Sequence, residues 1–120
     1  MKVLVIDDDP NVNQLICKIL KQENHTFQKA FNGVEGLKIL HEYPDFDLII
    51  CDIIMPEKEG IETIREARSN YPDIKIIAIS GGGKIGADNY LKLDRALGAD
   101  YILEKPFTVG DMIYLLEKIK

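Results

Sequence analysis

The chain of 120 residues has few cysteines and no excess of basic residues. Small secreted domains depend on the first, and nucleic-acid-binding proteins on the second. Its two cysteines, Cys17 and Cys51, are too few for the disulfide framework of a small secreted protein. Both lie in apolar segments, so we expect two buried, unreactive thiols. The net charge of −5 at pH 7 excludes an overall basic field for nucleic acid or an anionic membrane. We therefore expect neither among the partners of this domain.

Long apolar runs are lacking too. The apolar run within residues 1–6 meets three aspartates before it is long enough for a signal peptide or a membrane span, so the cytoplasm is the expected location. No segment has the composition of a disordered region. The length suffices for one well-covered core but not for a catalytic domain with a separate substrate-binding domain. We expect a single domain over residues 1–120.

The chain does contain an alternation of short apolar runs and helical patterns. Residues 48–51 are all apolar, which is typical of a strand covered by helices on both faces. Strands are predicted at residues 2–6, 26–31, 47–51, 74–79 and 101–103. Helices are predicted from residue 10 to about 24, from about 61 to 70, from 88 to 98 and from 109 to 119. A further helix, the second in chain order, contains residues 34–40 and ends before Pro44. This order indicates an α/β fold with a five-stranded parallel sheet, doubly wound as a flavodoxin-like three-layer sandwich.

Helix faces are assigned from the spacing of apolar residues. In the first helix, capped by Asp9 before Pro10, the expected buried face is Val12, Leu15, Ile16, Ile19 and Leu20. Asn13 is placed on the opposite, solvent side. Val34 is placed on the buried face of the second helix, and His25 and His41 are expected to be exposed at element ends.

Polar side chains stand where four of the predicted strands end. Asp7 and Asp8 follow the first strand, Asp52 the third, Ser80 the fourth and Lys105 the fifth. Because the strands of a parallel sheet all point the same way, we expect these residues to meet at its carboxyl edge, where α/β folds bind ligands.

This set of side chains suits phosphoryl transfer. Three neighbouring carboxylates repel one another, and a hard divalent cation such as Mg²⁺ relieves the repulsion. A lysine adds positive charge and a serine adds a hydrogen bond. A carboxylate nucleophile, Mg²⁺, an ammonium group and a hydroxyl together provide attack on phosphorus and positive charge on its oxygens.

Over its whole length the sequence resembles the receiver domain of two-component response regulators. The motifs that carry the resemblance are Asp7-Asp8-Asp9-Pro10 after an apolar strand, Asp52-Ile53-Ile54-Met55-Pro56 with Gly60, Ser80 after an apolar strand, and Lys105-Pro106-Phe107. Each motif is short, and their order and spacing make the combination specific.

The resemblance implies a role for each site residue. Asp52 would accept a phosphoryl group from a phosphohistidine on a sensor histidine kinase or histidine phosphotransfer protein. Asp8, Asp52 and the backbone carbonyl of Ile54 would bind Mg²⁺, with Asp7 acting through a coordinated water. Lys105 would pair with the phosphoryl oxygens, and Ser80 would move its hydroxyl towards them.

The same resemblance implies a regulator and not an enzyme, beyond its own phosphorylation and dephosphorylation. The face of the fourth helix, last strand and last helix would signal to a downstream protein target. No output domain is expected within this chain, which fits a stand-alone regulator or part of a larger protein.

One departure from the family pattern, and the residues that flank the phosphoryl group, change what we expect of the switch. Ile102 stands where the family usually has an aromatic residue, and Tyr101 should point to the opposite side of the strand. Ile54 and Gly82 stand at the positions that flank the phosphoryl group in the family. Neither has a side chain that orients water, so we expect slow self-dephosphorylation.

Two other functions remain open. A phosphatase of the haloacid dehalogenase type would use Asp7 as nucleophile with Asp9, although Asn11 stands where that family has Thr or Val. A receiver-like interaction module would signal without phosphate.

Overall fold

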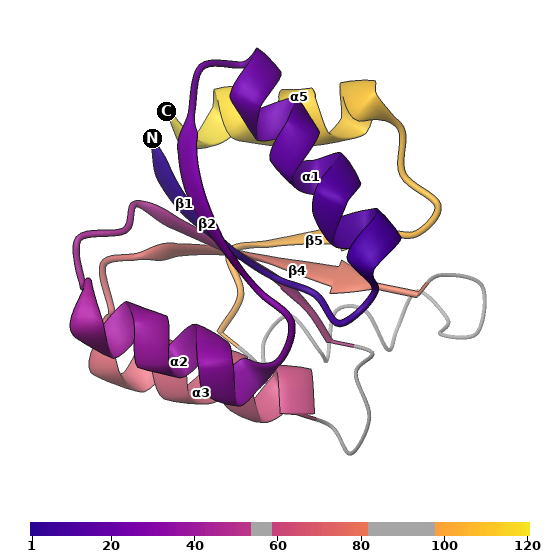
Figure 1. Cartoon of the computed structure of the whole chain (residues 1–120). Coiled ribbons are helices and arrows are strands. Elements are labelled where there is room, and N and C mark those ends of the chain that lie inside the picture. The colour runs from indigo at the N-terminus through magenta and orange to yellow at the C-terminus, as the bar shows by residue number, and fades with distance from the viewer. Residues whose placement is uncertain (54–58, 82–97) are drawn as a thin grey trace.

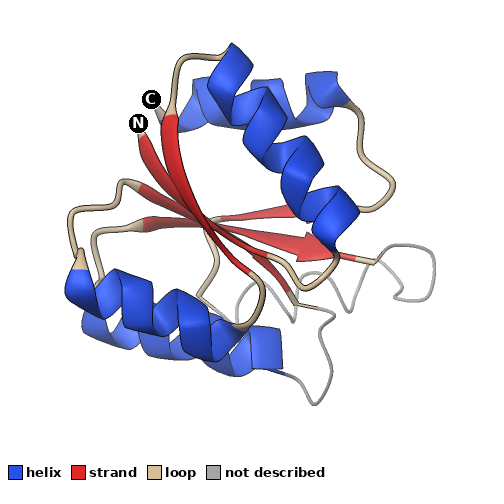
Figure 2. Ribbon diagram, viewed as in Figure 1, coloured by secondary structure: helices blue, strands red, loops and turns tan. Residues whose placement is uncertain are grey.

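The computed structural model describes residues 1–53, 59–81 and 98–120, and a grey trace marks the rest in Figure 1. Five strands form one parallel sheet in the order β2-β1-β3-β4-β5 (Figure 2). The strands are β1 (Lys2–Ile6), β2 (Thr26–Ala30), β3 (Leu48–Asp52), β4 (Lys75–Ser80) and β5 (Tyr101–Glu104). From β1 the chain adds β2 on one side and the later strands on the other. In folds with such a reversal of strand order, ligands bind beside the carboxyl ends of the two strands where the order reverses, here β1 and β3.

Helices cover both faces of the sheet, as predicted. The first face carries α1 (Pro10–Gln22) and α5 (Val109–Ile119), and the second carries α2 (Gly33–Glu42) and α3 (Glu59–Asn70) (Figure 1). The predicted helix at 88–98 lies outside the described residues except for Gly98. None of the helices in the described ranges has the length and apolar character needed to cross a bilayer.

Each face of the sheet has its own apolar core. Ile16, Leu20 and Met112 pack with Val5 and Ile50 on the α1 and α5 side. On the other side, Leu40 and Ile64 pack with Leu4, Ile6 and Ile49. Residues alternate between the two cores along each strand because successive side chains point to opposite faces.

Three predictions about buried thiols and strand faces are confirmed. Cys17 and Cys51 are both buried, one in each core. Tyr101 packs against the α1 and α5 core, whereas Ile102 packs against the α2 and α3 core. The two neighbours in β5 therefore do face opposite sides.

The predicted faces of α1 were partly wrong. Asn13 is fully buried, and Leu15 is 40% exposed. At about 100° per residue, Asn13 stands one and two turns before Cys17 and Leu20, whereas Leu15 lies beyond the edge of the buried stripe. A face drawn through every apolar residue of the helix therefore includes Leu15 and leaves out Asn13, and both assignments are wrong.

Val34 and His25 also differ from expectation. Val34 is 75% exposed because it lies in the first turn of α2, at the end of the helix. His25 is buried because Asn24 adopts φ +63° and reverses the chain after α1. Its Nδ1 lies 2.8 Å from the Met1 amino nitrogen. Burial lowers the pKa of His25, with a further contribution from that amino group. His41 is exposed, as predicted.

Candidate functional site

Asp52 and Lys105 form the centre of the site at the carboxyl edge of the sheet. Asp52 ends β3, whose five residues are all buried, and only 2% of Asp52 is exposed. Lys105 follows β5 and reaches back past β4, so that its Nζ lies 2.8 Å from Asp52 Oδ2. Burial lowers the pKa of Lys105, but the hydrogen bond to Asp52 and the charges of Asp52 and Asp7 outweigh it and raise that pKa. The ammonium group therefore stays charged at neutral pH.

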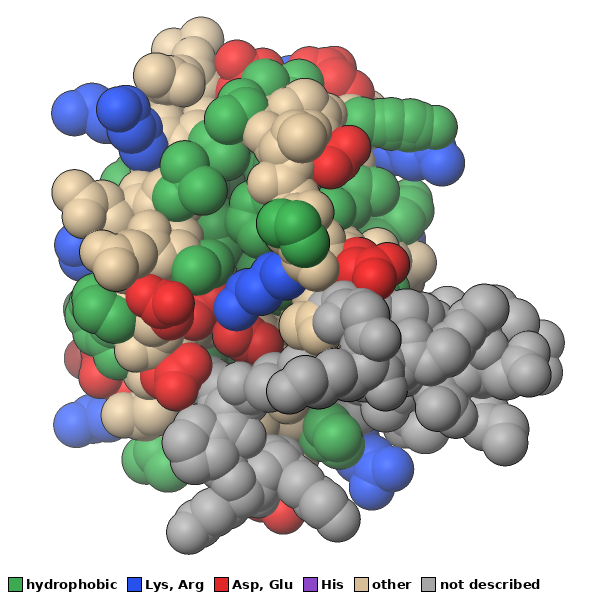
Figure 3. Space-filling view, turned by 90° about the vertical axis from the view of Figure 1, so that its right-hand side faces the viewer, with side chains coloured by type: hydrophobic (Ala, Val, Ile, Leu, Met, Phe, Trp, Pro, Cys, Tyr) green, Lys and Arg blue, Asp and Glu red, His purple; other side chains and the backbone are tan. Residues whose placement is uncertain are grey.

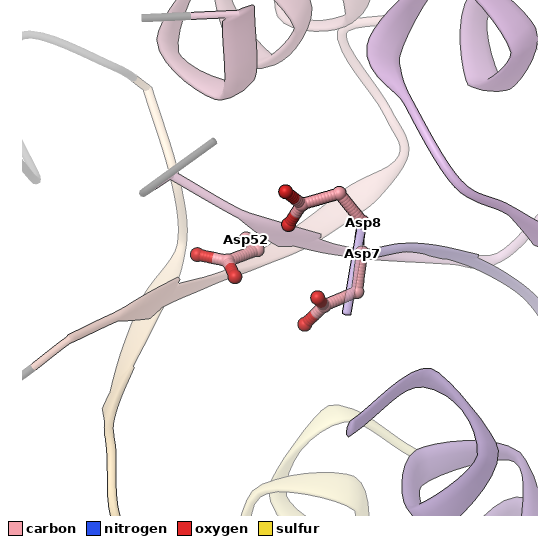
Figure 4. Close-up of side chains that lie close together, drawn as sticks. All are labelled: Asp7, Asp8 and Asp52. Atoms are coloured by element: carbon pink, nitrogen blue, oxygen red, sulfur yellow. The ribbon is translucent and has the colours of Figure 1, made fainter. Parts of the chain in front are cut away.

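Asp7 and Asp8 approach Asp52 from the end of β1 (Figure 4). One carboxylate oxygen from each of the three residues lies within 4.8 Å of the other two. Asp7 is fully buried, and its Oδ1 accepts a hydrogen bond of 2.9 Å from the Asp9 amide. Asp8 is exposed. The three acids therefore form one cluster that opens to solvent on the Asp8 side.

The second oxygen of Asp7 has no hydrogen-bond donor among the described residues. Lys105 Nζ lies 3.8 Å from it. Burial raises the pKa of Asp7 to about 6, and the charges of Asp52 and Asp8 add to the rise, while the Asp9 amide and Lys105 oppose it. A buried oxygen of this kind needs a proton or a cation.

The donor set suits a hard divalent cation. Three carboxylates offer only oxygen ligands, which Mg²⁺ prefers, and ligand oxygens around one Mg²⁺ lie about 3 to 4 Å apart. The unpartnered Oδ2 of Asp7 gives a second reason to place a cation here. Asp7, Asp8 and Asp52 can therefore hold a metal ion.

Ser80 and Gly60 complete the described surroundings of Asp52. Ser80 ends β4 and is fully buried, and its hydroxyl has no hydrogen-bond partner among the described residues. Its carbonyl accepts a hydrogen bond of 2.7 Å from the Lys105 amide. Gly60, in the first turn of α3, packs so closely that a Cβ there would lie 2.2 Å from the Asp52 carbonyl oxygen.

The predicted site residues are brought together as far as the structure describes them. Asp7, Asp8, Asp52, Ser80 and Lys105 all stand at the carboxyl ends of the strands. The Ile54 carbonyl and Gly82, also predicted to take part, lie outside the described residues. Asn13 was missed as a neighbour of the site. Its spacing from Cys17 and Leu20 was the signal that placed it on the buried face.

A hollow of about 420 Å³ adjoins the acidic cluster, and its lining is mainly apolar. The lining residues are Val12, Leu15, Gly81, Lys105, Pro106 and Phe107. Figure 3 shows a basic side chain beside a group of acidic ones, with hydrophobic side chains gathered next to them. A partner that reaches Asp52 by this route would meet an apolar surface first.

The sequence matches the family model of the response regulator receiver domain over residues 3–117. It is 32% identical to the response regulator receiver protein CpdR of Brucella abortus, with 98% of this chain and 95% of that protein covered. It is 35% identical to a CpxR homolog, a transcriptional regulatory protein of Haemophilus influenzae. That match covers 98% of this chain but only 49% of the relative. Against the sensor kinase CckA of Brucella abortus, the chain spans only 11% of the relative.

Solved structures agree with the sequence matches. The chemotaxis protein CheY4 of Vibrio cholerae superposes with a TM-score of 0.87 at 26% identity, covering 99% of this chain and 98% of that chain. NtrX from Brucella abortus gives a TM-score of 0.88 at 27% identity, covering 98% of this chain and 26% of that one. The family model matches nearly all residues of the chain, and the relatives and solved structures agree with it in sequence and fold. The chain therefore belongs to the response regulator receiver domain family.

Proposed function

We propose that this domain is the phosphoacceptor of a two-component or phosphorelay system, with Asp52 as the residue that is phosphorylated. The observation that carries the proposal is the 2.8 Å contact between Lys105 Nζ and Asp52 Oδ2 beside the carboxylates of Asp7 and Asp8. A nucleophilic carboxylate held next to a fixed positive charge is what phosphoryl transfer requires.

The donor is a phosphohistidine on a sensor histidine kinase or histidine phosphotransfer protein. A carboxylate oxygen of Asp52 attacks the phosphorus, and the bond between phosphorus and the imidazole nitrogen of the donor breaks. The electron pair returns to that imidazole nitrogen. The Lys105 ammonium group, 2.8 Å from Asp52 in the unmodified protein, is placed to neutralise charge on the phosphoryl oxygens.

Asp7, Asp8 and Asp52 would hold Mg²⁺, and when bound the ion supplies positive charge to the phosphoryl oxygens. Without a cation, ionising all three carboxylates is costly. The pKa of the buried Asp7 is accordingly raised to about 6. Donor docking would use the apolar hollow next to Lys105, lined in part by the exposed Leu15.

Ser80 would carry the signal from Asp52 to the adjoining segment. Its hydroxyl is buried and unpartnered among the described residues, so phosphoryl oxygens on Asp52 would offer it an acceptor. Ser80 and Lys105 are also joined through their backbones. A shift of Ser80 would therefore act on the start of the loop after β5.

Beryllofluoride, which mimics a phosphoryl group on aspartate, tests the proposal with backbone NMR. With Mg²⁺ present, the parent should show amide shifts at Asp52, Ser80 and Lys105, and Asp52→Asn should show none. Shifts that persist in Asp52→Asn and depend on Asp7 would favour the phosphatase alternative. No response in either protein would favour an interaction module that works without phosphate.

A further inference from the structure

Asn13 is a fully buried polar residue on an otherwise apolar helix face. The other buried residues of α1 are Ile16, Cys17, Ile19 and Leu20. A buried primary amide is costly unless its donors are hydrogen-bonded. The partners of Asn13 therefore explain why the site tolerates it.

The amide nitrogen of Asn13 donates to two carbonyls at the carboxyl ends of strands, and its Oδ1 accepts a weak hydrogen bond of 3.5 Å from Cys17 Sγ. Nδ2 donates to the Asp7 carbonyl at 3.1 Å and to the Ala30 carbonyl at 3.0 Å. The Asp7 amide donates to the same Ala30 carbonyl at 3.1 Å. One side chain thus joins α1 to the residue after β1 and to the last residue of β2.

The same residue fixes the turn that carries the acidic cluster. The Asn13 backbone amide donates to the Asp9 carbonyl at 2.9 Å, while its side chain holds the Asp7 carbonyl. The Asp9 amide in turn binds Asp7 Oδ1 at 2.9 Å. The turn from Asp7 to Asp9 is therefore held at both ends by Asn13.

This anchoring matters because the cluster repels itself. Asp7, Asp8 and Asp52 place carboxylate oxygens within 4.8 Å of one another, and Asp7 Oδ2 has no hydrogen bond among the described residues. The Asp7 side chain contributes one hydrogen bond, from the Asp9 amide to Oδ1, and this bond alone does not fix the turn on β1 and β2. Backbone hydrogen bonds of the turn must do so.

We propose that Asn13 is a positioning residue for the cation site, which holds the turn of Asp7 and Asp8 in its metal-binding arrangement without touching the ion. The proposal rests on the proposed function. Outer residues of this kind typically change metal affinity about 10- to 100-fold when they are replaced.

The test compares the Mg²⁺ dissociation constants of the parent, Asn13→Leu and Cys17→Ala, measured by NMR titration of the folded proteins. Leucine matches the shape of asparagine but cannot donate to either carbonyl. Cys17→Ala is the matched control, because it removes packing one turn along the same face and the weak hydrogen bond to Asn13 Oδ1, but leaves both Nδ2 hydrogen bonds to the strand carbonyls in place. We expect Asn13→Leu to weaken Mg²⁺ binding about 10-fold or more, and Cys17→Ala to stay within about twofold.

If Asn13→Leu does not fold, a second variant and a second measurement still test the inference. Asn13→Ser offers one donor, so at most one of the two hydrogen bonds survives, and its affinity should lie between those of the parent and the leucine variant. In both variants the Asp7 amide should exchange hydrogen faster than in Cys17→Ala. Parent-like Mg²⁺ affinity in a folded Asn13 variant would overturn this inference alone. A parent that binds no Mg²⁺ would overturn the proposed function as well.

Discussion

The close approach of α3 to β3 leaves no room for a side chain at position 60. A Cβ there would lie 2.2 Å from the Asp52 carbonyl oxygen and 2.7 Å from Ile53 Cα, both parts of the backbone. We expect Gly60→Ala to lower the free energy of unfolding by about 1 to 3 kcal/mol and to slow phosphorylation of Asp52. Urea unfolding and a phosphorylation time course measure the two effects.

Gly110→Ala is the control for Gly60→Ala. A Cβ at Gly110 would meet only Thr108 Oγ1 at 3.6 Å, and alanine favours a helix by up to about 1 kcal/mol over glycine. This variant should be as stable as the parent or more stable. If Gly60→Ala matched it, the close approach of α3 to Asp52 would not limit the site.

Asp7 makes the stability of the metal-free protein depend on pH. Its pKa is about 6 in the folded protein against 3.8 for a free side chain, so the folded state binds this proton more tightly than the unfolded state. The contribution of Asp7 to stability is therefore most favourable below pH 4 and falls as pH rises through 6. The fall amounts to about 3 kcal/mol for a shift of this size.

The difference in unfolding free energy between the parent and Asp7→Asn isolates this contribution. In EDTA, the parent should lose stability relative to Asp7→Asn between pH 4 and pH 7, and the variant should become the more stable protein at the upper end. A difference that does not change with pH would mean that Asp7 is not protonated in the folded, metal-free protein.

At the scale of elements, Arg68 joins the end of α3 to the start of β5. Its Nε donates to the Gly98 carbonyl at 2.8 Å, and one terminal nitrogen donates to the carbonyls of Pro72 and Ile74. The other terminal nitrogen pairs with Asp100. Asp100 also accepts a hydrogen bond from the Ile76 amide of β4 at 2.8 Å.

We expect Arg68→Ala to cost about 2 to 4 kcal/mol of unfolding free energy, because it leaves the partly buried carbonyls of Gly98 and Ile74 without a donor and removes the ion pair with Asp100. Arg65→Ala, on the exposed side of the same helix, should change it by less than about 0.5 kcal/mol. Thermal unfolding compares them. Equal losses would show that the network around Arg68 contributes no more than an ordinary surface arginine.

At the scale of the whole molecule, the position of the site was predictable and part of its support was not. Asp7, Asp52 and Lys105 meet because parallel strands have one direction, and that direction follows from the alternation of strands and helices. The hydrogen bonds of Asn13 join α1 to Ala30 on another strand, and no local pattern announces such a partner. The burial of His25 follows from the left-handed conformation of Asn24, which the sequence does not reveal.

The faces of α1 show the limit of reading helices by residue type. Leu15 was placed inside because it is apolar, and Asn13 outside because it is polar. Angular position on the helix reverses both assignments, and both exceptions lie near the site. Asn13 holds the acidic turn, and Leu15 lines the hollow beside Lys105.

The account rests most directly on Asp52 as the phosphoacceptor. Intact mass measured after incubation with acetyl phosphate, with Mg²⁺ or with EDTA, tests it on the parent and on Asp52→Asn. We predict that the parent gains the mass of one phosphoryl group only when Mg²⁺ is present, and that Asp52→Asn gains none. A modified Asp52→Asn, or an unmodified parent that binds Mg²⁺, would contradict the account.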